Sequence, residues 1–145
     1  MLLSIMSYTN KTLINDIKMP NGEMSAVAKS FIPAGTLLGI HGGDVVEFPI
    51  VNNRIVHKTV EHKEIVQICI NDNTLLGLVS PKDEIWSGID FINHSCNPSV
   101  AARDRIVIYA LTDIKEGQEL TMDYREWDLI PEGIQCWCKN KQCSI

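Results

Sequence analysis

Residues 91–98 of this chain read Phe-Ile-Asn-His-Ser-Cys-Asn-Pro, which places an amide, an imidazole, a hydroxyl and a thiol in one loop that ends at a proline. Burying so many polar groups is costly unless each has a hydrogen-bond partner. The chemistry alone leaves three interpretations open: a Cys–His nucleophile pair, a set of metal ligands, or a hydrogen-bonded structural turn. Taken in isolation, the stretch favours the structural turn.

A second informative stretch covers residues 114–124 and reads Ile-Lys-Glu-Gly-Gln-Glu-Leu-Thr-Met-Asp-Tyr. Together with residues 93–98 it resembles the SET-domain family, which pairs an Asn-His-Ser-Cys-x-Pro segment with a later Gly-Glu-Glu-Leu-Thr-x-Asp-Tyr segment. Gln118 is the single departure in the second segment. Residues 32–36, Ile-Pro-Ala-Gly-Thr, also look like a turn of that family, so the resemblance runs from about Gly22 to the C-terminus.

This resemblance implies a protein-lysine N-methyltransferase that uses S-adenosyl-L-methionine. It implies a mostly β fold with little α over residues 1–130, made of several short-stranded sheets with a knot-like C-terminal segment. Methyl transfer from a sulfonium to an amine is an in-line displacement, so the protein has to align, desolvate and deliver a neutral amine. The family achieves this with a narrow lysine channel on one side and a cofactor pocket on the other.

Two residues are predicted to lie at the reacting atoms. Tyr124 is the main catalytic candidate, because the family places this hydroxyl where the methyl group meets the amine, where it would orient and polarise. A core aromatic ending a strand is the alternative for Tyr124. His41 stands where the family often has a tyrosine lining the active site, so it would affect substrate choice or the number of methyl groups added.

The resemblance also assigns the cofactor contacts. The amide of Asn93 would hold the methionine end of the cofactor, and backbone groups of Asn93 and His94 would read its adenine edge. The family usually has Gly-x-Gly just before the first strand, and three further contacts are predicted there: Gly22, Glu23 and Met24. Ser25 takes the place of the last glycine, which suits a backbone contact if its φ is negative.

Residues 136–143 read Cys-Trp-Cys-Lys-Asn-Lys-Gln-Cys, so three thiols fall within eight residues. A structural zinc site needs four ligands. In the SET family a Cys-x-Cys-x4-Cys tail, the post-SET segment, binds zinc together with the cysteine of the Asn-His-Ser-Cys loop. The resemblance therefore implies a zinc-binding tail at 131–145 and one zinc per chain, held by Cys96, Cys136, Cys138 and Cys143. Free or regulatory thiols at a frayed end are the alternative.

Trp137 lies between two of these cysteines. If zinc fixes the tail, its indole would contact the cofactor or the mouth of the lysine channel, since an aromatic wall suits a sulfonium or a cationic amine. An indole that merely packs the tail onto the domain remains equally open.

Composition limits the partners. The 145 residues are one domain's worth, and 45% hydrophobic residues suffice for one core. A formal charge of −5 disfavours nucleic acid and suits a basic protein or peptide that presents a lysine, of which a histone tail is one candidate. No apolar run is long enough to cross a membrane. Five cysteines, three of them in the last ten residues, suit a metal site in a reducing compartment, cytoplasmic or nuclear.

Runs of β-branched residues between turn signals predict strands at 27–32, 36–40, 45–48, 54–60, 65–70, 99–103, 105–112 and 119–121. A capping serine followed by Pro81 and acidic residues predicts a short helix that ends near Gly88. A catalytically silent binding module with the same fold is the main alternative function, motivated by His41 and the missing Gly-x-Gly. A small zinc protein that binds nucleic acid is a weaker alternative.

Overall fold

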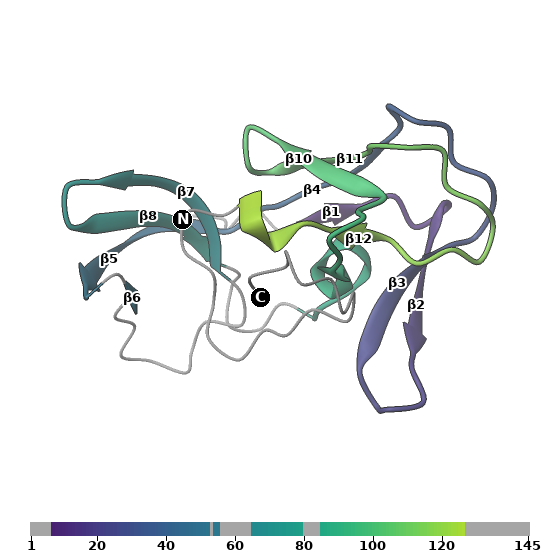
Figure 1. The fold of residues 1–145 in the computed structure, drawn as a ribbon, viewed down its shortest axis with the longest axis horizontal. Coiled ribbons are helices and arrows are strands. Elements are labelled where there is room, and N and C mark those ends of the chain that lie inside the picture. The colour runs from purple at the N-terminus through teal and green to yellow at the C-terminus, as the bar shows by residue number, and fades with distance from the viewer. Residues whose placement is uncertain (1–6, 53, 56–64, 80–84, 127–145) are drawn as a thin grey trace, which may run out of the picture.

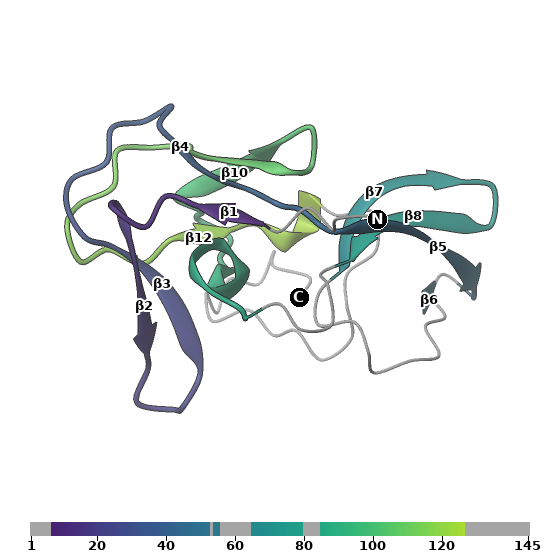
Figure 2. The same cartoon turned by 180° about the vertical axis from the view of Figure 1, so that it is seen from behind.

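The computed structural model describes residues 7–52, 54–55, 65–79 and 85–126, which form four small β-sheets and two 3-10 turns (Figures 1 and 2). This confirms the predicted mostly β fold of several short-stranded sheets. In the described part of the chain, no helix has the length and apolar character needed to span a membrane.

The central sheet supplies most of the main core. It contains β1 (Tyr8–Thr9), β4 (Leu37–Ile40), β11 (Val107–Ala110) and β10 (Val100–Arg103) in that order, all antiparallel. Its buried side chains include Leu38, Val100 and Ile108. Gly39 of β4 has to be glycine, because a Cβ there would lie 2.5 Å from the Tyr8 carbonyl oxygen and 2.6 Å from Ile89.

A hairpin of β2 (Ile14–Lys18) and β3 (Met24–Ala28) projects from this sheet (Figure 1). Residues 118–122 lie between β3 and β9 (Asn93–His94): the Leu120 amide donates to the Ala26 carbonyl at 2.8 Å, and β12 (Thr121–Met122) pairs in parallel with β9. This central placement of a late segment, hydrogen-bonded on both sides, corresponds to the knot-like feature expected from the sequence.

The remaining sheet lies at the opposite end of the molecule from the β2–β3 hairpin (Figure 2). It has the order β6 (Arg54–Ile55), β5 (Asp44–Val51), β8 (Thr74–Val79), β7 (Ile65–Asn71) and its own small core of Phe48, Leu75 and Val79. The strand predicted to stop at Pro49 runs through it. The Ile50 amide donates to the Asn73 carbonyl on the β8 side, so the Pro49 nitrogen, which has no N–H to donate, faces away from β8.

Several other boundaries differ from the sequence prediction. The strand predicted at 27–32 is β3 at 24–28, because a turn at residues 19–23, with Gly22 at φ +89°, pairs these residues with β2. The strand predicted at 119–121 is β12 at 121–122, since Glu119 forms only an isolated bridge. β8 was not predicted. Of the strand predicted at 54–60, only β6 falls within the described residues.

The predicted helix ending near Gly88 is wrong over residues 85–88, while residues 80–84 lie outside the described part. A 3-10 turn, η1 (Gly88–Phe91), begins where the helix was expected to end. Gly88 has φ +56°, which a right-handed α-helix cannot contain, and a Cβ there would overlap Thr9. The Asp90 carboxylate accepts the Ser87 amide at 3.0 Å and closes the start of η1.

Candidate functional site

The parallel pairing of β9 with β12 brings the two motifs of the sequence together. Thr121 lies opposite Asn93 and Met122 lies opposite His94. The chain then turns into η2 (Tyr124–Glu126), which places Tyr124 over the residue 92–94 segment. The candidate site is therefore built from segments that are about 30 residues apart in sequence.

His94 links the residue 92–94 segment to Tyr124 through a hydrogen bond to its imidazole. Its side chain is 1% exposed, and its Nδ1 accepts the backbone N–H of Tyr124 at 3.0 Å. Because an accepting Nδ1 carries no proton, Nε2 carries it, and Nε2 lies 3.5 Å from Cys96 Sγ. Asp123 Oδ1 lies 3.9 Å from Nδ1, too far to compete with that acceptor role. The imidazole is thus fully engaged within the protein, as the structural-turn interpretation requires.

Tyr124 is fixed at both ends. Its hydroxyl donates to the Ile92 carbonyl oxygen at 2.5 Å, and its ring centroid lies 5.3 Å from that of His94, tilted by 52°. The ring is half-buried and packs against the main core. A catalytic role and a core-packing role for Tyr124 are therefore compatible with each other. The aromatic ring contributes to the core, while the hydroxyl oxygen is held beside the residue 92–94 segment.

Asn93 joins three segments. Its Nδ2 lies 3.1 Å from the Met24 carbonyl oxygen and 3.0 Å from Glu119 Oε1. Met24, at the start of β3, is therefore brought to Asn93 as the cofactor prediction requires. Ser25 follows in β3 with a φ outside the left-handed region, fully buried, its hydroxyl 3.4 Å from the Ile17 carbonyl oxygen. The backbone conformation of Ser25 is therefore the one that a serine in place of the family's glycine needs.

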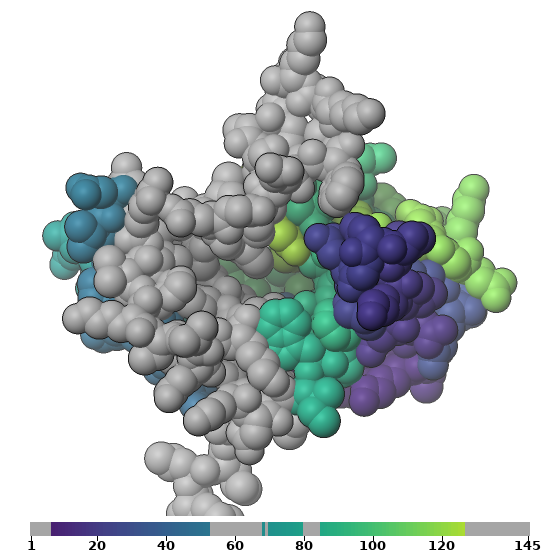
Figure 3. Space-filling model, turned by 90° about the horizontal axis from the view of Figure 1, so that it is seen from below, coloured from purple at the N-terminus to yellow at the C-terminus, as the bar shows by residue number. Residues whose placement is uncertain are grey.

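Gly22 and Glu23 occupy the turn of the β2–β3 hairpin. Gly22 donates its amide to the Met19 carbonyl at 2.8 Å, and both residues are exposed. Figure 3 shows the hairpin (dark blue) beside the segment around η1 (teal) on one face. Met24 is the one of these three predicted cofactor contacts that hydrogen-bonds to Asn93 in the described part of the chain.

His41 lies at the end of β4, on the same face as Gly39 and thus toward η1. It is buried, its amide donates to the Ile106 carbonyl at 2.9 Å, and its Nδ1 has no hydrogen-bond partner among the described residues. Burial lowers the pKa of the imidazole, and the negative charge of Asp90 partly opposes this. Asp90 Oδ1 and Trp86 Nε1 are also buried, and the described part of the chain offers neither atom a hydrogen-bond partner. His41 is therefore neutral at physiological pH.

The buried neutral state of His41 predicts a pH-dependent stability. The unfolded chain protonates this imidazole near pH 6.5, whereas the native chain binds the proton only at lower pH. We expect the free energy of unfolding to fall as the pH drops below about 6.5, and His41→Phe to weaken this dependence. Urea unfolding curves of both proteins between pH 5 and 8 measure it. An identical pH dependence in both would contradict the assignment.

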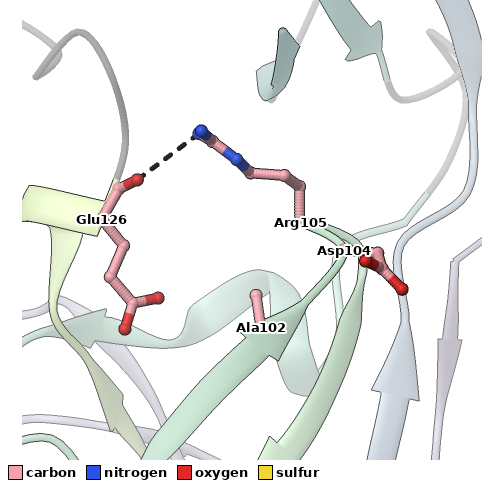
Figure 4. Close-up of a pocket in the computed structure, with 4 residues that line it drawn as sticks. All are labelled: Ala102, Asp104, Arg105 and Glu126. Carbon is pink, nitrogen blue, oxygen red and sulfur yellow. Dashed lines mark hydrogen bonds between the residues drawn. The ribbon is translucent and has the colours of Figure 1, made fainter.

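A surface pocket lies beside η2, lined by Ala102, Asp104, Arg105 and Glu126 (Figure 4). Arg105 and Glu126 face each other across it, and Arg105 Nη1 lies 3.4 Å from the Glu126 carbonyl oxygen. Burial, followed by the charge of Asp123, raises the pKa of the Glu126 carboxyl, and Arg105 opposes this. The contact ties η2 to the β10–β11 turn and so helps to hold Tyr124. None of the predicted site residues in the described part of the chain lines this pocket.

The sequence profile of the SET domain matches residues 23–125. The chain belongs to the SET-domain family. The match includes β3, β9, β12 and Tyr124, the elements that meet in the candidate site. Residues 131–145, predicted to form a post-SET tail, lie beyond the matched residues.

Curated relatives of this SET domain are large proteins. A histone-lysine N-methyltransferase, H3 lysine-4 specific, from Emericella nidulans is 48% identical over 64 residues, covering 37% of this chain and 5% of the relative. A protein of the same name from Candida albicans is 35% identical over 121 residues, covering 69% and 11%. Histone-lysine N-methyltransferase ash1 of Drosophila melanogaster is 40% identical over 75 residues, covering 46% and 3%. The chain thus spans a small fraction of these relatives' length.

A crystal structure of a Plasmodium falciparum protein, described as a candidate histone methyltransferase, aligns with a TM-score of 0.43 and 18% identity, covering 77% of this chain and 92% of that one. The family assignment does not depend on this alignment.

Of the four cysteines predicted to bind zinc, only Cys96 lies among the described residues; Cys136, Cys138, Cys143 and Trp137 lie outside them. Within the described ranges, no group of three or more His, Cys, Asp or Glu side chains could hold a metal ion. The Nε2–H of His94 facing Cys96 Sγ suits a thiolate, which accepts such a hydrogen bond. The zinc site and the 131–145 boundary stay predictions.

Glu119 contacts a predicted site residue, although the sequence analysis assigned no role to it. It lies in the Gly-Gln-Glu-Leu motif, and its carboxylate reaches Asn93. The motif itself was the available signal, but only the packing of residues 118–122 against β9 shows which side chain it contacts.

Proposed function

We propose that this chain is a protein-lysine N-methyltransferase that transfers methyl groups from S-adenosyl-L-methionine to the ε-amine of lysine. The main structural support is a pair of hydrogen bonds from Tyr124 to the residue 92–94 segment. The Tyr124 amide donates to His94 Nδ1, and the Tyr124 hydroxyl donates to the Ile92 carbonyl oxygen. The family membership and the names of the relatives, all histone-lysine N-methyltransferases, support the same reaction.

The bound cofactor supplies an electrophilic methyl group on its sulfonium. The Tyr124 hydroxyl donates its single proton to the Ile92 carbonyl oxygen. Toward the amine and the methyl group, the hydroxyl oxygen can therefore act only as a hydrogen-bond acceptor. That arrangement orients an incoming amine through its N–H groups and attracts the polarised methyl group, without the tyrosine acting as a nucleophile. A pre-aligned acceptor needs no reorganisation during transfer.

Delivery of a neutral amine is the second requirement. A lysine amine has a pKa of about 10.4 in water, and an apolar channel lowers it by penalising the charge. If His41 lies at this channel, its neutral imidazole adds no positive charge to oppose entry of the substrate. We propose that His41 lines this channel and influences which amine or methylated amine fits.

The cofactor would lie against Met24, Asn93 and His94, with Gly22 and Glu23 at its edge. The φ of Ser25 lies outside the left-handed region, which suits a backbone contact with the cofactor and supports an enzyme over a silent module. We further propose that residues 131–145 form a tail in which Cys136, Cys138 and Cys143 join Cys96 on one zinc, with Trp137 against the cofactor or the channel mouth.

The expected partner is a basic protein or peptide that presents a lysine. A histone tail is the leading candidate, because the named relatives act on histones and the formal charge of −5 suits a cationic partner. A nuclear location follows from that substrate. Mass spectrometry of a lysine-containing peptide library after incubation with enzyme and cofactor identifies the substrate and the number of methyl groups.

Binding of S-adenosyl-L-methionine is the direct test of the proposal. We expect isothermal titration of the full chain to show one site. Asn93→Ala should raise the dissociation constant about tenfold or more, because a hydrogen bond to a charged ligand group is lost. Asn97→Ala, an exposed asparagine in the same loop, is the matched control. Absence of binding by the intact protein would favour the silent module instead.

A further inference from the structure

The Asn93 side chain uses both of its N–H groups within the protein. The two atoms nearest Nδ2 are acceptors, the Met24 carbonyl oxygen at 3.1 Å and Glu119 Oε1 at 3.0 Å. A flipped amide would point its carbonyl oxygen at both and would be repelled by each. The network therefore fixes the orientation of the amide, and Oδ1 is the atom left to meet a ligand.

Glu119 is well placed to impose that orientation, because its backbone is clamped on two sides. It forms a bridge with Val27 of β3, and its carbonyl oxygen accepts the Ser99 hydroxyl at 3.1 Å. The same hydroxyl oxygen accepts the Thr121 amide at 3.0 Å, which fixes the chain two residues further on. The half-buried carboxylate thus reaches Asn93 from a rigid segment.

We propose that Glu119 is a positioning residue for the cofactor: it fixes the Asn93 amide so that Oδ1 accepts a hydrogen bond from the α-ammonium group of S-adenosyl-L-methionine. The methionine end of this ligand carries an ammonium, which donates, and a carboxylate, which accepts. Only the ammonium complements Oδ1. Asn93 therefore selects the amino group of the ligand, and Glu119 makes this selection possible.

This inference rests on the proposed cofactor, and a pair of ligands separates the two. S-adenosylhomocysteine and its analogue lacking the α-amino group differ only in the proposed donor. We expect the wild-type chain to bind the first about tenfold or more tightly than the second in isothermal titration. In Glu119→Gln, whose amide no longer restricts Asn93 to one orientation, this preference should shrink to about threefold or less, mainly by weaker binding of the amino ligand.

The controls distinguish positioning from folding and from charge. A structural role alone would weaken both ligands equally, which would overturn the inference, as would an unchanged preference in Glu119→Gln. Glu119→Asp keeps the charge but retracts the acceptor, so it should also lose the preference. Glu116→Gln, an exposed glutamate of the same loop, should retain it. If the wild type binds neither ligand, the proposed function fails; if it binds both equally, only the Glu119 and Asn93 assignment fails.

Discussion

Tyr124→Phe is expected to lower the turnover of methyl transfer by about 100-fold or more, the scale found when one pre-aligned polar group is removed from an active site. The variant loses the hydroxyl oxygen but keeps the ring that packs on His94 and the amide that donates to it. The lost hydrogen bond to Ile92 should cost only about 1 kcal/mol of stability. Single-turnover methylation measures the effect, and titration with cofactor checks that binding is retained.

Tyr109→Phe provides the matched control. Tyr109 lies in β11 of the central sheet, where it pairs with Ala101 of β10 and Leu37 of β4 and has the Arg103 guanidinium 5.1 Å from its ring centroid. The same chemical change there should leave turnover within about twofold of wild type. Wild-type turnover in Tyr124→Phe would refute the role of the hydroxyl.

Removal of zinc is expected to abolish methyl transfer while most of the β-sheet remains. The three tail cysteines need Cys96 as a fourth ligand, so the metal would tie the C-terminus to the loop that carries His94. Among the residues that the structure describes, the central sheet and the buried core are built from residues up to 122. Metal analysis should give one zinc per chain, and chelation should stop turnover with little change in the far-ultraviolet circular dichroism.

Cys96→Ser should reproduce the effect of chelation, because a hydroxyl is a far weaker zinc ligand than a thiolate. Cys69→Ser, in β7 of the outlying sheet, changes a thiol in the same way and should keep both the zinc and the activity. A metal-free protein with full activity would overturn the site. So would a Cys96→Ser variant that holds zinc as tightly as the parent.

The sequence predicted the fold class because its two polar motifs are specific to one family. It located the central strands near 36–40 and 99–112 because their β-branched runs end at clear turns. It missed β8, where Leu75, Leu76 and Leu78 carry no β-branched signal, and there the pairing with β5 and β7 decides the structure. It extended a helix through Gly88, whose left-handed φ follows from tight packing on Thr9.

The sequence named the residues of the candidate site but not the hydrogen bonds between them. Asn93, His94 and Tyr124 could be named because each belongs to one of the two family motifs, and the structure brings the three residues together. The hydrogen bonds of the His94 imidazole and the Asn93 amide could not be foreseen, since their partners come from other segments of the chain. Local sequence contains no information on such partners until the topology is known.

The clamping of Asn93 between β3 and residues 118–122 also has a consequence for folding kinetics. Its two partners lie 69 and 26 residues away along the chain, so the amide proposed to bind the cofactor acquires its orientation only after these two long loops have closed. Such non-local contacts form slowly and cannot exist in any short fragment. Cofactor that binds only the finished topology stabilises the whole domain by mass action. The melting temperature in the presence of ligand therefore reports whether the chain has completed its long-range pairing.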